Sequence, residues 1–320
     1  MSLLQVNNLV VEFPNRRGTL RALDGISFDI APGEILGVVG ESGAGKSLTG
    51  ASIIGLLEPP GRVASGEIVL EGRPIHKLPP EQMRRVRGRQ IGAIFQDPLT
   101  SLNPLYSVGR QLIETITTHL PVSAAEARER AIGLLRDTGI PAAEQRIDHY
   151  PHQFSGGMRQ RVVIALALAA EPRLIVADEP TTALDVSIQA QVINLLEDLQ
   201  AKMGLTYLFI AHDLSVVEHI SNRVAVMYLG RVVEIAPSRE LYTHPKHPYT
   251  EALLSAVPIP DPKAKKKRIV LTGDVPNPVN RPTGCHFHPR CPKATERCKV
   301  EEPVLKNVGT QHQAACHLND

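Results

Sequence analysis

The chain has 320 residues, of which 42% are hydrophobic and 21% are charged, so it can bury a full core and is not a disordered chain. Its 35 lysines and arginines nearly balance its 33 acidic residues, and the formal charge of +2 points to neither nucleic acid nor an anionic membrane as a partner. No apolar stretch approaches the roughly eighteen residues of a membrane span, and residues 1–6 lack a signal-peptide pattern, so we expect a cytoplasmic chain without disulfides.

The first third of the chain predicts strands around a glycine-rich loop. Alternating and β-branched apolar residues over 4–13 and 20–30 favour an antiparallel strand pair. A short apolar run over 34–40 is typical of a strand buried on both faces, and a helical pattern follows the loop from Lys46 to Leu57. Residues 91–95 predict another short strand.

The character of the chain changes twice after residue 98. Amphipathic patterns over 108–120 and 124–138 predict a helical insertion. Buried-strand runs over 174–177 and 207–211, separated by a helix over 187–203, then predict a doubly wound parallel sheet. The later elements are a hairpin over 223–227 and 231–235, a helix ending near 257 and a proline-rich and lysine-rich linker over 258–268.

The glycine-rich loop fits the pattern G-x-x-x-x-G-K-[ST] and lies between a buried strand and a helix. Glycines allow backbone N–H groups to surround a β-phosphate, and the helix N-terminus adds a positive end. We expect Lys46 to reach the β and γ oxygens and the Ser47 hydroxyl to bind Mg²⁺, roles that a merely tight glycine turn would leave unexplained. The residues predicted to bind ATP here are Gly40, Ser42, Gly43, Ala44, Gly45, Lys46, Ser47 and Leu48.

Two acidic residues, Asp178 and Glu179, end the apolar run over 174–177. Ligands bind at the carboxyl ends of strands in open α/β sheets. We therefore expect Asp178 to hold the Mg²⁺ shell and Glu179 to polarise the attacking water. The alternative is that the two acids cap a helix, an interpretation that the presence of a phosphate loop upstream disfavours.

A second phosphate-binding arrangement, Ser155-Gly156-Gly157, opens a predicted helix and is followed by Gln160. One chain does not need two such arrangements for a single γ-phosphate. These residues resemble the signature motif of the ATP-binding cassette (ABC) ATPases, in which the signature of one subunit closes over the phosphate loop of its partner. The sequence also matches this family's Q-loop, D-loop and switch histidine at Gln96, at Ala183-Leu184-Asp185 and at His212.

The resemblance implies a fold and a set of roles. The fold is an α/β P-loop NTPase with a RecA-like core, an antiparallel β subdomain, a helical insertion and a small C-terminal metal-binding tail, divided at 1–97, 98–155, 156–245 and 246–320. Gln96 would sense the γ-phosphate and Mg²⁺, and His212 would hold the γ-phosphate and Glu179. Phe13 would stack on adenine, unless its ring belongs to the core of the first strand pair.

Two further stretches, beginning at Gln96-Asp97-Pro98 and at His247-Pro248-Tyr249, resemble the ATPase subunits of bacterial dipeptide and oligopeptide importers. This resemblance implies a second, different ATPase subunit, two transmembrane permeases and an extracytoplasmic peptide-binding protein, at the cytoplasmic face of the inner membrane. Nickel, glutathione or another small solute is an alternative cargo.

A non-transport ABC ATPase acting on nucleic acid or the ribosome is the alternative from another class. It predicts a long coiled coil or a second cassette, and the sequence has neither. The basic run over 263–268 lacks interleaved aromatic residues, so we interpret it as a solvated surface and expect no nucleic-acid partner.

The cysteines, Cys285, Cys291, Cys298 and Cys316, all lie near the end of the chain. Their intervals of five, six and seventeen residues are wider than those of zinc knuckles and do not match tight ferredoxin runs. Clustered thiolates in a cytoplasmic protein still favour a soft metal. The resemblance implies a [4Fe–4S] cluster, structural or regulatory, held by all four. The alternatives are Zn²⁺, with His286, His288 or His317 as substitute ligands, and free buried cysteines.

Overall fold

The computed structural model describes residues 2–15, 18–182, 184–257 and 268–320. These residues form two compact units. Unit 1 consists of residues 31–34 and 77–210, and unit 2 consists of residues 2–30, 35–76 and 211–320. Within the described ranges no helix is long and apolar enough to cross a membrane.

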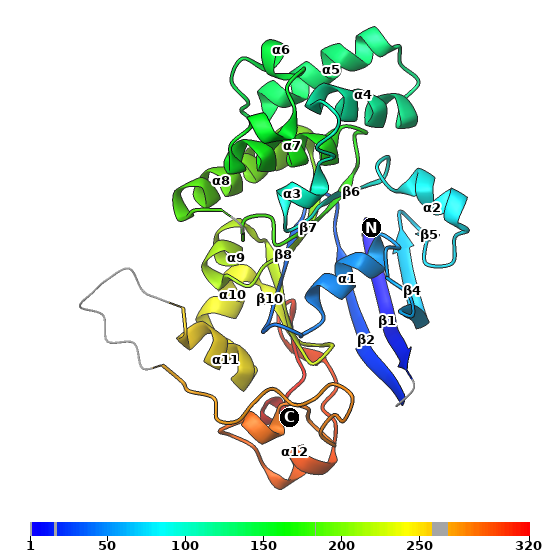
Figure 1. The fold of residues 1–320 in the computed structure, drawn as a ribbon. Coiled ribbons are helices and arrows are strands. Elements are labelled where there is room, and N and C mark those ends of the chain that lie inside the picture. The colour runs from blue at the N-terminus through cyan, green and yellow to red at the C-terminus, as the bar shows by residue number, and fades with distance from the viewer. Residues whose placement is uncertain (1, 16–17, 183, 258–267) are drawn as a thin grey trace, which may run out of the picture. The chain divides into compact units, whose positions relative to one another are not determined.

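Unit 2 contains an antiparallel sheet in the order β2-β1-β4-β5, in which β1, β2 and β4 lie side by side (Figure 1). The predicted first strand pair is confirmed, because β1 and β2 pair antiparallel from Leu4 with Ile30 onward. The predictions did not include β4, which pairs with β1 across a register shift. The strands are β1 (Leu4–Asn15), β2 (Gly18–Ile30), β4 (Arg62–Leu70) and β5 (Arg73–Pro74).

Unit 2 also contributes strands in the order β11-β12-β10-β9-β3, of which β3 and β9 are parallel. The predicted hairpin is present as β9 and β10, and all of β3 is buried as its apolar run predicts. Two tail strands, β11 and β12, extend this sheet and were not predicted. The strands are β3 (Ile35–Val39), β9 (Arg223–Tyr228), β10 (Arg231–Pro237), β11 (Lys306–Gly309) and β12 (His312–Ala314), and the helices are α1 (Lys46–Ile53), α9 (Leu214–Ile220), α10 (Ser238–Thr243), α11 (Pro248–Ser255) and α12 (Glu296–Val300).

Unit 1 has parallel strands in the order β8-β7-β6. The helical insertion is present, and α4 and α5 begin at the predicted residues because Ser107 and Ser123 cap them through their side chains. The strands are β6 (Ile91–Ile94), β7 (Leu174–Asp178) and β8 (Thr206–Ile210), and the helices are α2 (Pro80–Val86), α3 (Pro98–Ser101), α4 (Val108–His119), α5 (Ala124–Asp137), α6 (Ala143–Arg146), α7 (Gly156–Leu168) and α8 (Val186–Met203). The predicted linker over 258–268 lies outside the described residues except for its last position.

A buried carboxylate joins the tail to the hairpin in unit 2. Glu234 on β10 is fully buried, and its Oε1 and Oε2 accept the backbone N–H groups of Lys246 and His247 at 2.6 and 3.0 Å. The Nε2 of the buried His312 on β12 lies 2.7 Å from the same Oε1. Because a buried charge needs such partners, this carboxylate holds β12 and the segment before α11 against β10.

Replacing Glu234 with alanine is expected to lower the free energy of unfolding by about 3 kcal/mol, since it removes one member of a buried, hydrogen-bonded pair. Urea denaturation measures the change. The control is Glu240→Ala, which removes a carboxylate that is 44% exposed, and it is expected to change stability by less than about 0.5 kcal/mol. Equal stability of the two variants would show that the Glu234 contacts contribute nothing.

Candidate nucleotide site

The predicted phosphate loop connects β3 to α1, and its lysine is folded back onto it. Lys46 is 6% exposed, and its Nζ donates to the backbone oxygens of Gly40 and Glu41 at 2.8 and 3.3 Å. These carbonyls lie at the start of the loop, so the ammonium group bridges its two ends. A phosphate oxygen that replaced them would find a cation already inside the loop.

Two positions of the loop require glycine. Gly45 has a φ of 100°, and a Cβ there would lie 2.6 Å from the Leu23 Cδ2. Gly40 has a φ of 152°, and a Cβ there would collide with the backbone oxygen of Met227. Neither conformation nor space allows another residue, so the loop glycines are needed for its path as well as for phosphate access.

Helix α1 begins in a way that leaves its N-terminus to a ligand. Gly45 supplies no side-chain cap, and no acidic residue lies in the first turn. The positive end of the helix macrodipole is therefore not countered by a carboxylate of the helix. Ser42, Gly43 and Ser47 are exposed, which makes the outer side of the loop accessible.

Glu179 follows β7 in a strained backbone conformation. Its φ is 47°, a left-handed value that is uncommon for a residue other than glycine, and its backbone N–H donates to the oxygen of Ile210 at 2.9 Å. The Thr182 Oγ1 and the Gln96 Nε2 donate to its Oε2 at 3.0 and 3.1 Å. Non-glycine residues in this region occur at functional sites more often than elsewhere.

The structure brings the side chains of Gln96 and Glu179 together within unit 1. Gln96 precedes Asp97, whose side chain accepts the Leu99 N–H at 2.8 Å and caps α3, the first helix after residue 97. The amide of Gln96 is thus one residue away from the insertion and in contact with Glu179. Asp178 ends β7 and is half-buried.

The signature residues open α7. The Ser155 hydroxyl accepts the Met158 N–H at 3.4 Å, so it caps its own helix, and both Ser155 and Gly156 are exposed. Gly157 packs against α8, because a Cβ there would lie 2.7 Å from the Ile188 Cγ2. Gln160 is 1% exposed, and neither amide atom has a hydrogen-bond partner among the described residues. Of these four residues, Ser155 and Gly156 are therefore the most accessible to another chain, and Gln160 is the least.

The remaining predicted positions are distributed over both units. His212 and Phe13 belong to unit 2, as the phosphate loop does, whereas Asp185 belongs to unit 1 and is exposed where α8 begins. Phe13 is half-buried on β1, and its ring lies against Gly61, where a Cβ would be 2.6 Å from the Phe13 Cε1. Ala183 lies outside the described residues.

Four side chains in and around the loop were not predicted. Glu41, inside the loop, receives both guanidinium nitrogens of Arg290 at 2.6 and 3.0 Å, and its backbone N–H donates to the Tyr249 hydroxyl at 2.9 Å. Burial lowers the pKa of His247 to about 4, so its neutral Nδ1 accepts the Tyr249 N–H at 3.1 Å. The sequence offers one signal for these contacts, the stretch His247-Pro248-Tyr249 that opens α11.

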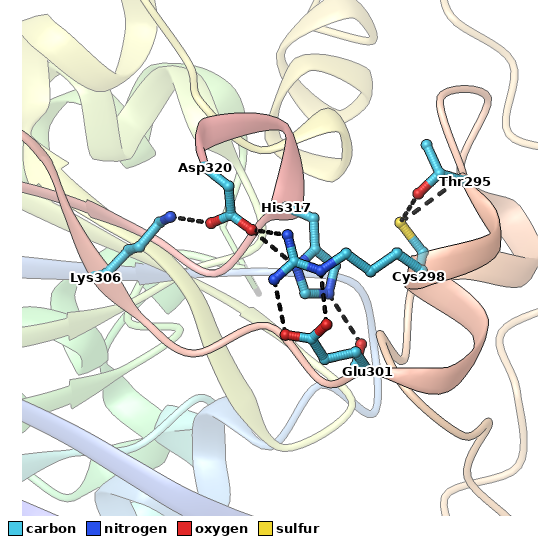
Figure 2. A network of polar contacts seen from close by, with 7 residues as sticks. Thr295, Cys298, Glu301, Lys306, His317 and Asp320 are labelled. Atoms are coloured by element: carbon cyan, nitrogen blue, oxygen red, sulfur yellow. Dashed lines mark hydrogen bonds and ion pairs between the residues drawn. The ribbon is translucent and has the colours of Figure 1, made fainter.

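The tail that carries the four cysteines, residues 285–320, includes α12 and a network of charged side chains near the C-terminus. Figure 2 shows the Asp320 carboxylate beside Lys306 and His317, and the Cys298 sulfur beside Thr295, whose Oγ1 lies 3.3 Å from it. The hydrogen bond from Lys306 is the largest cause that lowers the pKa of Asp320, to about 2. Asp320 thus forms ion pairs with Lys306 of β11 and with Arg297 of α12, which hold the end of the chain to both elements.

The four thiols influence one another, but a metal site among them is not shown. Burial, together with the nearby Cys285, Cys291 and Cys298, raises the pKa of Cys316 to about 11. All four are free cysteines. Among the described residues, no group of three histidines, cysteines or acids could hold a metal ion, so the metal-binding part of the predicted fold is not shown.

Comparisons with known proteins cover nearly the whole chain. The family model described as "ABC transporter" matches residues 23–182, and the model described as "Oligopeptide/dipeptide transporter, C-terminal region" matches residues 233–298. The chain is 50% identical over 314 residues to a putative peptide import ATP-binding protein of Brucella ovis, which covers 98% of this chain and 97% of that protein. It is 46% identical over 318 residues to the dipeptide transport ATP-binding protein DppD of Escherichia coli, with 99% and 97% covered.

Solved structures agree with this fold. The dimeric post-hydrolysis structure of the ATP-binding cassette MJ0796, bound to ADP and Pi, aligns with a TM-score of 0.66 at 28% identity and covers 74% of this chain and 99% of that chain. The structure of cbiO1 from Clostridium perfringens, part of the ABC transporter complex cbiONQ, aligns with a TM-score of 0.65 at 30% identity, with 76% and 91% covered.

Proposed function

The chain belongs to the family of ABC transporter ATP-binding proteins for peptide import, and from this premise we propose that it couples hydrolysis of Mg-ATP to the uptake of dipeptides or oligopeptides across the bacterial inner membrane. The observation that carries the proposal is the phosphate loop, in which Lys46 is buried against the backbone oxygens of Gly40 and Glu41 at the start of an uncapped helix. A cation and a helix N-terminus at one loop favour a triphosphate.

We assign the phosphates and the Mg²⁺ ion to different residues of the site. Lys46 and the loop backbone would hold the β- and γ-phosphates. The hydroxyl of Ser47 and the amide oxygen of Gln96 would bind Mg²⁺, and the carboxylate of Asp178 would hold the shell of that ion. Hard oxygen donors of this kind suit that ion. Bound Mg²⁺ neutralises charge that develops on the phosphate oxygens. Phe13, half-buried on β1, is the residue that we assign to adenine.

Glu179 is the residue that we assign to the attacking water. Its carboxylate is already held by Thr182 and Gln96, so it is oriented before substrate arrives. As the general base, the Glu179 carboxylate would accept a hydrogen bond from the attacking water. It would take up a proton from that water as the water oxygen attacks the γ-phosphorus. His212 would hold the γ-phosphate and Glu179 in the closed state.

Two subunits complete two sites. Ser155, Gly156 and Gly157, with Gln160 behind them, would close over the phosphate loop of a second ATPase subunit, which we propose is a different chain. The exposure of Ser155 and Gly156 supports this role. Closure around ATP and release after hydrolysis form a two-state switch that moves the helical insertion.

The proposed assembly contains two transmembrane permeases and an extracytoplasmic peptide-binding protein, with this chain at the cytoplasmic face of the inner membrane. The test is uptake of a labelled dipeptide by cells that lack the gene for this chain and carry either the wild type, Glu179→Gln or the control Lys202→Ala, which removes an exposed ion pair with Asp137. We expect uptake with the wild type and the control only. Dipeptide uptake without the gene, together with loss of nickel or glutathione uptake, would overturn the peptide assignment.

We also propose that Cys285, Cys291, Cys298 and Cys316 hold a [4Fe–4S] cluster. The Cys285 backbone N–H donates to the oxygen of Cys298 at 2.8 Å, which supports the proximity of these two cysteines, and the other three thiols all contribute to raising the pKa of Cys316. Iron and acid-labile sulfide are to be measured, with the visible spectrum, on protein purified without oxygen. Stoichiometric iron and sulfide that are lost in Cys298→Ser are expected, and stoichiometric zinc without sulfide would replace the cluster with the alternative metal.

A further inference from the structure

The phosphate loop contains a carboxylate at a place where a polyanion is expected. Glu41 is the residue directly after Gly40, and the Lys46 Nζ donates to its backbone oxygen at 3.3 Å. An uncompensated carboxylate so close to bound phosphates would repel them. In the structure the carboxylate is paired with a side chain of the tail, and the Glu41 backbone is held by a side chain of α11. Both side chains belong to unit 2 together with the loop.

Arg290 neutralises the carboxylate. Its guanidinium donates to the Glu41 Oε2 and Oε1 at 2.6 and 3.0 Å, a bidentate geometry that fixes direction as well as charge. The Arg290 side chain is 7% exposed, and its Cζ lies 5.9 Å from the centroid of the Tyr228 ring. Because the Arg290 side chain is buried, few other rotamers are open to it, and its ion pair with Glu41 is held in one geometry. The pair therefore differs from an exposed surface ion pair, whose side chains are mobile.

The backbone of Glu41 is held as well. Its N–H donates to the hydroxyl of Tyr249, a side chain that is fully buried at the start of α11. The Tyr249 ring lies 4.7 Å from that of Tyr228 and 5.3 Å from that of Phe287, between ring centroids. Phe287 is 1% exposed and precedes Arg290 by three residues, so one aromatic cluster positions both groups that contact Glu41.

We propose that Arg290 and Tyr249 are positioning residues for ATP binding, through which the C-terminal tail holds the phosphate loop by its Glu41 and cancels the charge of that side chain. The inference rests on the proposed function, because it concerns the loop that would bind the triphosphate. In this role the C-terminal tail contributes directly to the geometry and charge of the nucleotide site. Arg290 and Phe287 both lie between Cys285 and Cys291, so a change in this part of the tail would reach the loop through the Arg290 ion pair and through the ring of Tyr249 that packs on Phe287.

The test measures the dissociation constant of Mg-ATP by calorimetry on the full-length chain, in a Glu179→Gln background that prevents turnover. Arg290→Gln is expected to weaken binding about tenfold, since it removes a charge-assisted pair and frees a negative charge in the loop. Arg290→Gln combined with Glu41→Gln is expected to regain most of that affinity, because the carboxylate that repels phosphate is gone. Tyr249→Phe is expected to weaken binding by about threefold through the lost hydrogen bond.

The matched control is Lys293→Gln, which removes another ion pair of the tail, that with Glu251 at 2.7 Å, and is expected to bind as the parent does. Thermal unfolding of every variant is followed in parallel. Equal affinity of Arg290→Gln and the parent overturns the inference, and so does a double variant as weak as Arg290→Gln, which would mean that Arg290 acts on the nucleotide itself. A parent that does not bind Mg-ATP overturns the proposed function instead.

Discussion

Replacing Glu179 with glutamine is expected to slow ATP hydrolysis by about a hundredfold or more while Mg-ATP binding is retained, because loss of a positioned general base costs factors of this size. Glutamine has nearly the same shape, so the hydrogen bond that Thr182 donates to the Glu179 Oε2 can be kept with the amide oxygen in that place. The amide cannot accept a proton from water. The variant therefore separates binding from chemistry.

Phosphate release and the affinity for Mg-ATP are to be measured on the same preparation. The comparison is Glu126→Gln, an exposed carboxylate of α5 that pairs with Arg130 at 2.9 Å and is expected to hydrolyse ATP at the parental rate. With hydrolysis blocked and binding kept, ATP is expected to hold this chain and the second ATPase subunit in a closed dimer, which size-exclusion chromatography of the two subunits together detects. Near-normal turnover of Glu179→Gln would remove Glu179 from its role.

The parts of the site that follow from the sequence are those that depend on neighbouring residues. The phosphate loop could be predicted because its glycines, its lysine and the start of its helix are contiguous. Helices α4 and α5 begin at the expected residues for the same reason, since Ser107 and Ser123 are local caps. The roles of Gln96 and Glu179 were predicted from order and resemblance, and the structure brings the two side chains to 3.1 Å.

The parts that the sequence did not predict depend on pairing between distant residues. Strand β4 is only partly buried and pairs with β1, while β11 and β12 are short and add to β10. The Arg290–Glu41 contact joins residues that are 249 positions apart. No local pattern marks an arginine among cysteines as the partner of a carboxylate in a phosphate loop. The division into 1–97, 98–155, 156–245 and 246–320 stays a prediction.

Replacing Lys46 with alanine is expected to weaken Mg-ATP binding by about a hundredfold or more, because truncating one partner of a buried charge contact costs several kcal/mol. This is the largest loss of affinity that we expect for a single substitution in this chain. The ammonium group is 6% exposed and lies within the loop, so a phosphate that binds there exchanges contacts with water for contacts with a desolvated cation.

The fold is expected to survive this change. Lys46 donates to the Gly40 and Glu41 oxygens, while separate bonds hold the loop, from the Ala44 N–H to the Glu41 oxygen at 3.1 Å and from the Gly230 N–H to the Ala44 oxygen at 2.9 Å. Calorimetry on Lys46→Ala and on Lys202→Ala, a lysine 60% exposed on α8, separates loss of this one cation from loss of positive charge in general. Tight Mg-ATP binding by Lys46→Ala would mean that backbone N–H groups alone hold the triphosphate.

The carboxylate of Glu41 lies at the same turn as Lys46, so a loop without Lys46 depends still more on Arg290 to neutralise that carboxylate. The double variant Lys46→Ala with Arg290→Gln is therefore expected to bind Mg-ATP more weakly than either single variant.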